Sequence, residues 1–161
     1  MACNCNKITN IIVSGLGGQG VLKVTDIIAD VLFRNGYDIK KSEVHGMSQR
    51  GGSVSSEVRF GCKVASPMVP YGECDILAVL QQDQVEVVLG KLKSGGVLIT
   101  PDDIPVDKLF NPKALNIMML GAISRYMDIP EDHWVEAIKN ALPEKFHAGN
   151  LEMFALGRGD L

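Results

Sequence analysis

The chain has 161 residues, of which 46% are hydrophobic and 22% are charged, with a formal net charge of −3 at pH 7. This composition is that of a globular protein, and the length predicts one domain spanning residues 1–161. The acidic balance argues against broad nucleic-acid binding, which normally requires a basic excess. No apolar run is long enough to span a bilayer, and the N-terminal MACNCNK lacks the apolar core of a signal peptide. We therefore expect a cytoplasmic protein without a nucleic-acid or membrane partner.

A glycine-rich turn joins the first apolar run to a long amphipathic segment, which indicates a strand, a tight turn and a helix. Its glycines have the G-x-G-x-x-G spacing of turns that approach a ligand or a neighbour closely. Backbone amides at the start of the following helix would favour an anion. The turn is therefore a candidate phosphate or nucleotide site, with plain packing of helix on strand as the alternative. The candidate contacts are Gly15, Gly17, Gly18, Gln19 and Gly20.

The next two elements only half satisfy the pattern of a dinucleotide-binding unit. Apolar periodicity predicts a helix from about Gly18 to the Asn35-Gly36 stop signal, followed by a strand over residues 37–44. An acidic residue that holds ribose hydroxyls is expected at the end of this strand. Asp38 lies at its start instead, and Glu43 lies beyond the usual spacing.

The segment from Ser42 to Ser53 combines three glycines with several polar side chains and has little apolar periodicity. As a loop after the second strand, it is predicted to stand at the carboxyl edge of the sheet, beside the glycine turn. Long glycine-rich loops in compact domains are usually functional. This one is expected to contact an anion or to dock on a partner chain, with a solvated connection as the alternative. The candidate residues are Glu43, His45, Arg50, Gly51 and Gly52.

Further along the chain the pattern predicts an inserted hairpin and then a return to parallel strands. Alternation over residues 54–60, a turn, and residues 64–66 indicate antiparallel pairing. Residues 76–80 and 97–100 read as buried strands, and Asp83 with Glu86 resembles a capping box for the helix between them. The predicted fold is therefore a three-layer, Rossmann-like α/β domain with a mostly parallel sheet and an inserted antiparallel hairpin.

The C-terminal third is predicted to be helical. Residues 114–127 read as a buried helix in which Gly121 allows close approach, Pro130 opens a second helix, and a third begins after Asn150. The methionines and Trp134 are expected to lie in the core, and His133 and His147 at the surface. Exposed Val and Met residues within residues 66–71 are expected to form an apolar surface that is prone to association.

Four cysteines occur without a C-x-x-C pair, so the spacing does not support a zinc or iron–sulfur site. Reduced thiols are the preferred interpretation. A metal site that uses Cys3, Cys5 and a distant third ligand remains an alternative.

Four segments together resemble the gamma-type subunit of 2-oxoacid:ferredoxin oxidoreductases, the pyruvate/ketoisovalerate oxidoreductase domain, and are most similar to the indolepyruvate beta subunit. They are GLGGQGV, SEVHGMSQRGGSVSSEVRFG, SPMVPYGECDIL and NIMMLGA. The resemblance covers residues 11–80 and 116–157, and the central loop is its most specific part.

The resemblance implies oxidative decarboxylation of a 2-oxoacid to acyl-CoA by an assembly that uses thiamine diphosphate with Mg, iron–sulfur clusters, coenzyme A and ferredoxin. It also implies that other subunits hold these cofactors, so this chain would bind none of them firmly and would be inactive alone. Expected partners are a larger catalytic subunit, ferredoxin indirectly, and a second copy in a homodimer. We assign no catalytic residue, because the sequence pairs no nucleophile or second carboxylate with His45.

The chain is shorter than this family pattern between Thr100 and Asn116, where a strand and a linker are expected. Part of a partner surface would then be missing. Two alternatives to the accessory subunit therefore stay open: a free-standing module that binds NAD or FAD, and a shortened structural relic of the complex.

Overall fold

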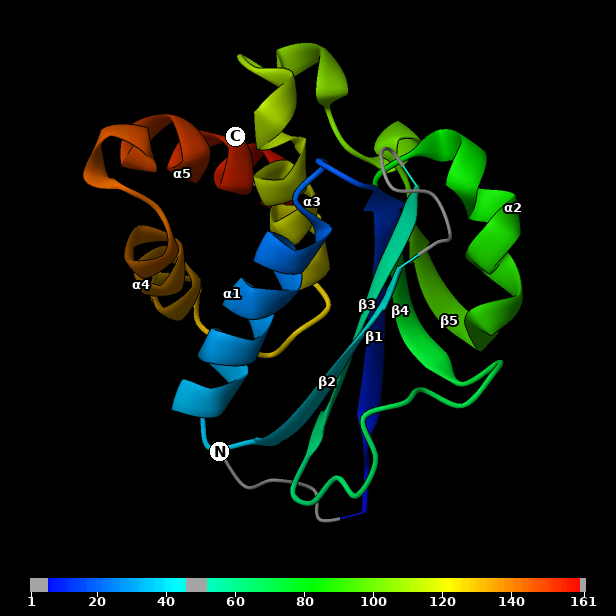
Figure 1. The fold of residues 1–161 in the computed structure, drawn as a ribbon. Helices are drawn as coiled ribbons and strands as arrows, with labels where there is room; N and C mark the ends of the chain where they lie inside the picture. The colour runs from blue at the N-terminus through cyan, green and yellow to red at the C-terminus, as the bar shows by residue number, and fades with distance from the viewer. Residues whose placement is uncertain (1–5, 46–51, 160–161) are drawn as a thin grey trace.

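The computed structural model describes residues 6–45 and 52–159, which form a five-stranded sheet flanked by helices (Figure 1). The strands are β1 (Thr9–Leu16), β2 (Asp38–His45), β3 (Ser53–Gly61), β4 (Cys74–Val79) and β5 (Leu92–Ile99). The helices are α1 (Val21–Arg34), α2 (Val85–Val88), α3 (Leu115–Ser124), α4 (Glu131–Ala141) and α5 (His147–Arg158). Helices lie on both sides of the sheet, α1 on one side and α2 on the other, so the predicted three-layer α/β class is confirmed (Figure 1).

The strand order is β2-β3-β1-β4-β5, and only part of this sheet is parallel. β1 pairs in parallel with β4, and β4 with β5, whereas β3 runs antiparallel to both β1 and β2. The sheet is therefore mixed, and the mostly parallel arrangement that we predicted holds only for β1, β4 and β5. Because β3 lies antiparallel between them, β1 and β2 run in the same direction and end at the same edge.

The antiparallel hairpin is built from different strands than the sequence indicated. We predicted that residues 54–60 pair with 64–66, but β3 pairs with β2, from Asp38 opposite Gly61 to His45 opposite Val54. Residues 64–66 are not a strand. Val64 is buried instead, and its amide donates to Asp38 Oδ2 at 2.7 Å, which fastens this segment to the start of β2.

Side-chain alternation along β1 gives the sheet two buried faces. Ile11 and Val13 belong to the large core formed with α1, α3, α4 and α5, and Ile12 belongs to a smaller cluster that includes Leu77 and Val88 of α2. Each fully buried side chain of this size contributes about 1.5–3 kcal/mol relative to exposure. Both clusters therefore hold β1 at the centre of the domain and fix the position of the turn that follows it.

Helices α3 and α5 cross at two glycines. A β carbon on Gly121 would lie 2.1 Å from the carbonyl oxygen of Phe154, and one on Gly157 would lie 1.8 Å from that of Met118. The predicted close approach at Gly121 is therefore confirmed. Trp134 and Met118 are 0% exposed, so their predicted place in the core is confirmed as well.

Two local predictions are wrong. The capping box is not formed, because Asp83 accepts from its neighbour Gln84, and α2 is only four residues long with no side-chain cap. Cys62 is disulfide-bonded rather than a reduced thiol, whereas Cys74 is a buried free thiol. Cys3 and Cys5 lie outside the described residues.

Among the described helices, none combines the length and the apolar character that crossing a bilayer requires.

Candidate functional site

The glycine turn connects the end of β1 to the start of α1 through two left-handed residues. Gly18 has a φ of 88° and Gly20, the N-cap of α1, has a φ of 80°, a region that L side chains rarely adopt. No side chain caps the helix. Within the described part of the chain, the backbone amides of Gly18, Val21 and Leu22 have no hydrogen-bond acceptor. The turn therefore presents free N–H groups at the positive end of α1.

Gln19 has a structural role inside the turn. Its Oε1 accepts from the amide of Leu16 at 2.7 Å, and its Nε2 donates to Gln81 Oε1 at 2.9 Å. A β carbon on Gly15 would lie 2.8 Å from Gln19 Oε1, so Gly15 must be small for this contact to form. Gly15 and Gln19, which the sequence predicted as cofactor contacts, therefore hold the turn against the segment after β4.

Gly52, at the end of the segment that follows β2, lies beside the glycine turn, where the sequence predicted the loop to stand. The amide of Gly17 donates to the carbonyl of Gly52 at 2.9 Å. Arg50 and Gly51 lie outside the described residues, so the anion contact predicted for them remains a prediction. The bond at Gly52 nevertheless joins the two candidate segments at one edge of the sheet.

A cavity of about 400 Å³, the turn cavity, opens between the start of α1, the end of β2 and the start of β3. Among the described residues, its lining includes one ionisable side chain, that of His45, and no nucleophile. The remaining lining is apolar or glycine: Leu16, Gly17, Gly18, Gly20, Val21, Leu22 and Val54. Such a cavity is suited to holding a ligand, with free amides at one side and an imidazole at another.

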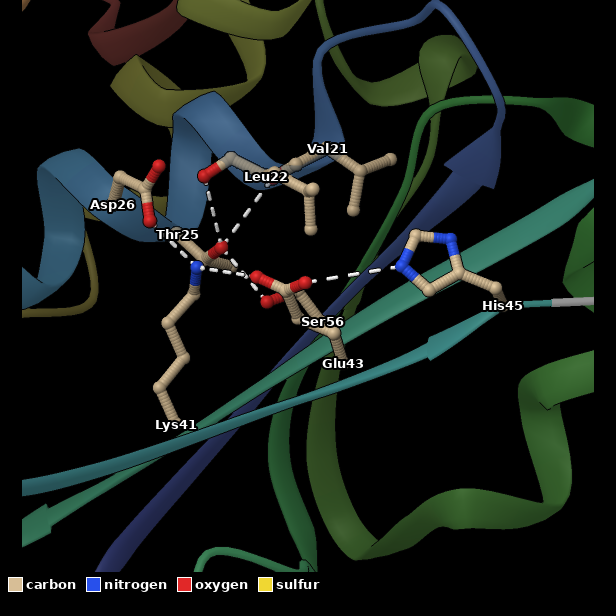
Figure 2. Close-up of polar contacts among 8 residues, drawn as sticks. All are labelled: Val21, Leu22, Thr25, Asp26, Lys41, Glu43, His45 and Ser56. Carbon is tan, nitrogen blue, oxygen red and sulfur yellow. Dashed lines mark hydrogen bonds and ion pairs between the residues drawn. The ribbon is translucent and has the colours of Figure 1, made fainter.

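A row of charged side chains along β2 leads to His45 (Figure 2). Lys41 Nζ lies 2.6 Å from Asp26 Oδ1 on α1 and 3.1 Å from Glu43 Oε1, and Glu43 Oε2 lies 3.8 Å from His45 Nε2. The sequence did not pair a carboxylate with His45, but the alternation of a strand places Glu43 on the same face. Because 3.8 Å is beyond hydrogen-bond range and His45 is 59% exposed, Glu43 does not fix the orientation of the imidazole ring.

A buried hydroxyl pair sets the distance between α1 and the sheet beneath the turn cavity. Thr25 Oγ1 and Ser56 Oγ lie 2.8 Å apart, and the Thr25 hydroxyl also lies within reach of the carbonyl of Leu22 (Figure 2). Both residues are 0% exposed. This contact joins the second turn of α1 to β3 and so helps to fix the start of α1 relative to the sheet.

Asn116 is a site residue that the sequence reasoning missed. It comes from α3, is 8% exposed, and its Nδ2 lies 3.5 Å from the carbonyl oxygen of Gly20. The only local signal was one asparagine within the apolar run of NIMMLGA, which could have been questioned because a buried amide needs a partner.

An α/β domain with a glycine turn at the carboxyl end of its first strand belongs to the Rossmann-like class of folds. Its family is defined by comparison: residues 10–159 match the family described as pyruvate ferredoxin/flavodoxin oxidoreductase. The chain belongs to this oxidoreductase family, which confirms the resemblance inferred from the four segments.

Several relatives support this assignment. An indolepyruvate oxidoreductase subunit of Pyrococcus horikoshii is 30% identical over 191 residues, covering 94% of this chain and 95% of the relative. A 2-oxoglutarate synthase subunit of Methanocaldococcus jannaschii is 28% identical over 174 residues and covers 89% of each chain. An alignment of 191 positions exceeds the 161 residues of this chain, so the Pyrococcus relative has segments that this chain lacks.

Solved structures share the fold. The gamma subunit of a keto/oxoacid ferredoxin oxidoreductase from Geobacter sulfurreducens superposes with a TM-score of 0.77 at 24% identity and covers 94% of both chains. A 2-oxoglutarate:ferredoxin oxidoreductase from Magnetococcus marinus, solved with 2-oxoglutarate, coenzyme A and succinyl-CoA bound, superposes with a TM-score of 0.83 at 23% identity. The match covers 96% of this chain and 31% of that longer chain.

Proposed function

We propose that this chain is the small accessory subunit of a 2-oxoacid:ferredoxin oxidoreductase, and that its turn cavity holds an anionic group of coenzyme A. The observation that carries the proposal is that the amides of Gly18, Val21 and Leu22, beside that cavity, have no acceptor among the described residues. Phosphate groups bind well at such helix starts. The bound coenzyme A in the Magnetococcus enzyme supports the choice of ligand.

The redox and thiamine chemistry belongs to larger partner subunits in this proposal. Across residues 6–45 and 52–159 there is no group of three or more His, Cys, Asp and Glu side chains that could hold a metal ion. The described residues therefore do not fit an iron–sulfur cluster. This chain binds and orients coenzyme A, while the partner carries the pyruvate-like or indolepyruvate-like substrate, thiamine diphosphate and the electron path to ferredoxin.

The alternative NAD-binding function has little support in the geometry. Asp38, the nearest carboxylate in the predicted spacing, pairs with Gly61 in register, whereas Gly15 of the turn pairs with Val54 at the opposite end of β3. The Asp38 carboxylate accepts from Val64 and lies 3.5 Å from Lys40. It is therefore at the wrong edge of the sheet to hold a ribose at the turn.

A single negative charge introduced at Gly18 tests the proposed anion site. It has a left-handed φ and no atom within 4 Å of a built β carbon, so Asn and Asp, which tolerate this conformation, both fit. In the assembled enzyme, Gly18→Asp should raise the KM for coenzyme A by about tenfold or more through repulsion of a nearby anion, whereas the neutral Gly18→Asn should change it little.

Gly36 supplies the matched control, because it also has a positive φ and open space but follows the other end of α1. Gly36→Asp should leave the KM for coenzyme A unchanged. Equal effects of Gly18→Asp and Gly18→Asn would contradict the anion site. An unchanged KM for coenzyme A in both Gly18 variants would show that coenzyme A does not bind at the turn cavity.

The accessory role is tested separately by anaerobic purification of the tagged chain from its host. A large subunit containing thiamine diphosphate and iron–sulfur clusters should co-purify. Arg50→Ala combined with Gly51→Val should abolish that association if the loop docks on the partner, and Arg125→Ala, an exposed arginine elsewhere, should not. Recovery of the wild-type chain alone would favour the relic instead.

A further inference from the structure

A second cavity of about 320 Å³ lies next to the turn cavity and shares only Gly20 with it among the described lining residues. It is formed where the start of α1 meets α3, α5 and the turn before α3. We call it the Phe cleft; it is lined by Gly20, Lys23, Phe110, Asn111, Lys113, Ala114, Asn116, Ile117, Leu142, Phe146 and Asn150.

Two aromatic rings in this cleft are left in contact with solvent. Phe110 is 60% exposed and Phe146 is 48% exposed, although both line the same cavity. Phe110 rests against Gly149, where a β carbon would lie 3.0 Å from the ring. Exposed aromatic surface gathered in one concave site favours a planar apolar ligand that can stack on it.

The charges in the Phe cleft are of one sign. Lys23 and Lys113 line it, and no described lining residue carries a carboxylate. Lys113 has no ion-pair partner within the described part of the chain, and Lys23 only approaches the carbonyl oxygen of Ala141 at 3.4 Å. A third cation, Lys145, lies 4.9 Å from the centroid of the Phe146 ring. The cleft therefore favours an anion.

Asn116 adds a buried hydrogen-bond donor to the cleft. It is 8% exposed, its Oδ1 accepts from the amide of Ile117 at 2.9 Å, and its Nδ2 has one long contact of 3.5 Å, to Gly20. An amide nitrogen carries two hydrogens. The Gly20 carbonyl uses one of these hydrogens in a long bond, so Nδ2 can also donate to an acceptor atom in the cleft.

We propose that the Phe cleft binds an aromatic anion. Its planar ring packs on Phe110 and Phe146, its phosphate or carboxylate lies near Lys23 and Lys113, and an acceptor atom meets Asn116 Nδ2. The ligand is either a nucleotide or a free aryl carboxylate, which share this chemistry. The inference is independent of the proposed function, because neither ligand type needs the thioester chemistry of coenzyme A.

The test is calorimetric titration of the full chain with two probes, AMP and indole-3-acetate. At least one probe should bind saturably with a Kd of about 1 mM or tighter. Phe110→Ala should weaken that binding about tenfold, as expected for the loss of one stacking partner. Lys113→Glu should weaken it by a similar factor through charge reversal.

Two matched controls make the result specific to the cleft. Lys108→Glu changes the net charge by the same amount at an exposed lysine outside the cavity, and Phe33→Ala removes a ring that is 73% exposed on α1. Both should keep the wild-type Kd within about twofold.

Binding of AMP alone would identify the source as a nucleotide, and binding of indole-3-acetate alone would identify an aryl carboxylate. Failure of both probes to bind would overturn the proposal. So would binding that the Lys108 and Phe33 variants weaken as much as the cleft variants do. Unfolding curves of the variants separate loss of binding from loss of structure. Because coenzyme A kinetics are not measured, this outcome is distinguishable from failure of the proposed function.

Discussion

The two left-handed glycines of the turn differ in their surroundings, which gives a sharp prediction for stability. Gly18→Ala should cost about 1–2 kcal/mol of unfolding free energy, because its β carbon meets open space and only the left-handed conformation is unfavourable. Gly20→Ala carries the same conformational cost and also places a β carbon 2.3 Å from Asn116 Nδ2. Displacing this buried side chain should add about 1–3 kcal/mol.

Chemical denaturation of both variants measures the difference in unfolding free energy, and thermal denaturation measures the shift in Tm. For a chain of this size each kcal/mol shifts Tm by about 2–4 °C, so Gly18→Ala should lower Tm by about 2–8 °C and Gly20→Ala by clearly more. A double-mutant cycle isolates the clash. On an Asn116→Ala background, which removes the amide, the cost of Gly20→Ala should fall to that of Gly18→Ala. Equal losses in the two single variants, or additive losses in the cycle, would refute this reasoning.

Three further predictions concern stability. Gly157→Ala should unfold the domain at much lower denaturant than wild type, because its β carbon would overlap the backbone carbonyl of Met118 at 1.8 Å; a loss like that of Gly18→Ala would contradict it. Burial raises the pKa of the Cys74 thiol to about 12, so unfolding free energy should fall between about pH 9 and pH 12 as the unfolded thiol ionises, and Cys74→Ala should remove this part of the decline. The hydrogen bond from the Val64 amide lowers the pKa of Asp38, so its contribution to stability should be present above the ordinary carboxyl pKa and lost as pH falls through the lowered pKa. Acid titrations of wild type and Asp38→Asn test this, and identical curves would count against it.

Local pattern was sufficient for the elements that carry the turn. The apolar run before Gly15, the periodicity of the next segment and the Asn35-Gly36 stop predicted β1 and α1, since these signals act over a few residues. The same holds for the position of β4. Gly52 also lies beside the turn as predicted, because β1 and β2 end at one edge even though β3 lies between them.

Strand pairing could not be obtained in this way. The alternation over residues 53–61 indicates a half-buried strand but does not say which strand lies beside it. β3 pairs with β1 about 45 positions away and with the preceding β2, a choice made by the burial of both faces of the sheet.

The sequence by itself determined the class of the fold, the glycine turn and the family, because these depend on short segments with specific spacing. Tertiary structure alone decided the mixed pairing of the sheet and the surroundings of Gly20, to which Asn116 contributes from 96 positions away. It also gathered Phe110 and Phe146 into one cleft with Lys23. The physical reason is that these contacts arise when α3 packs against α1 and α5 packs against α3, and no local periodicity encodes which distant side chains then meet.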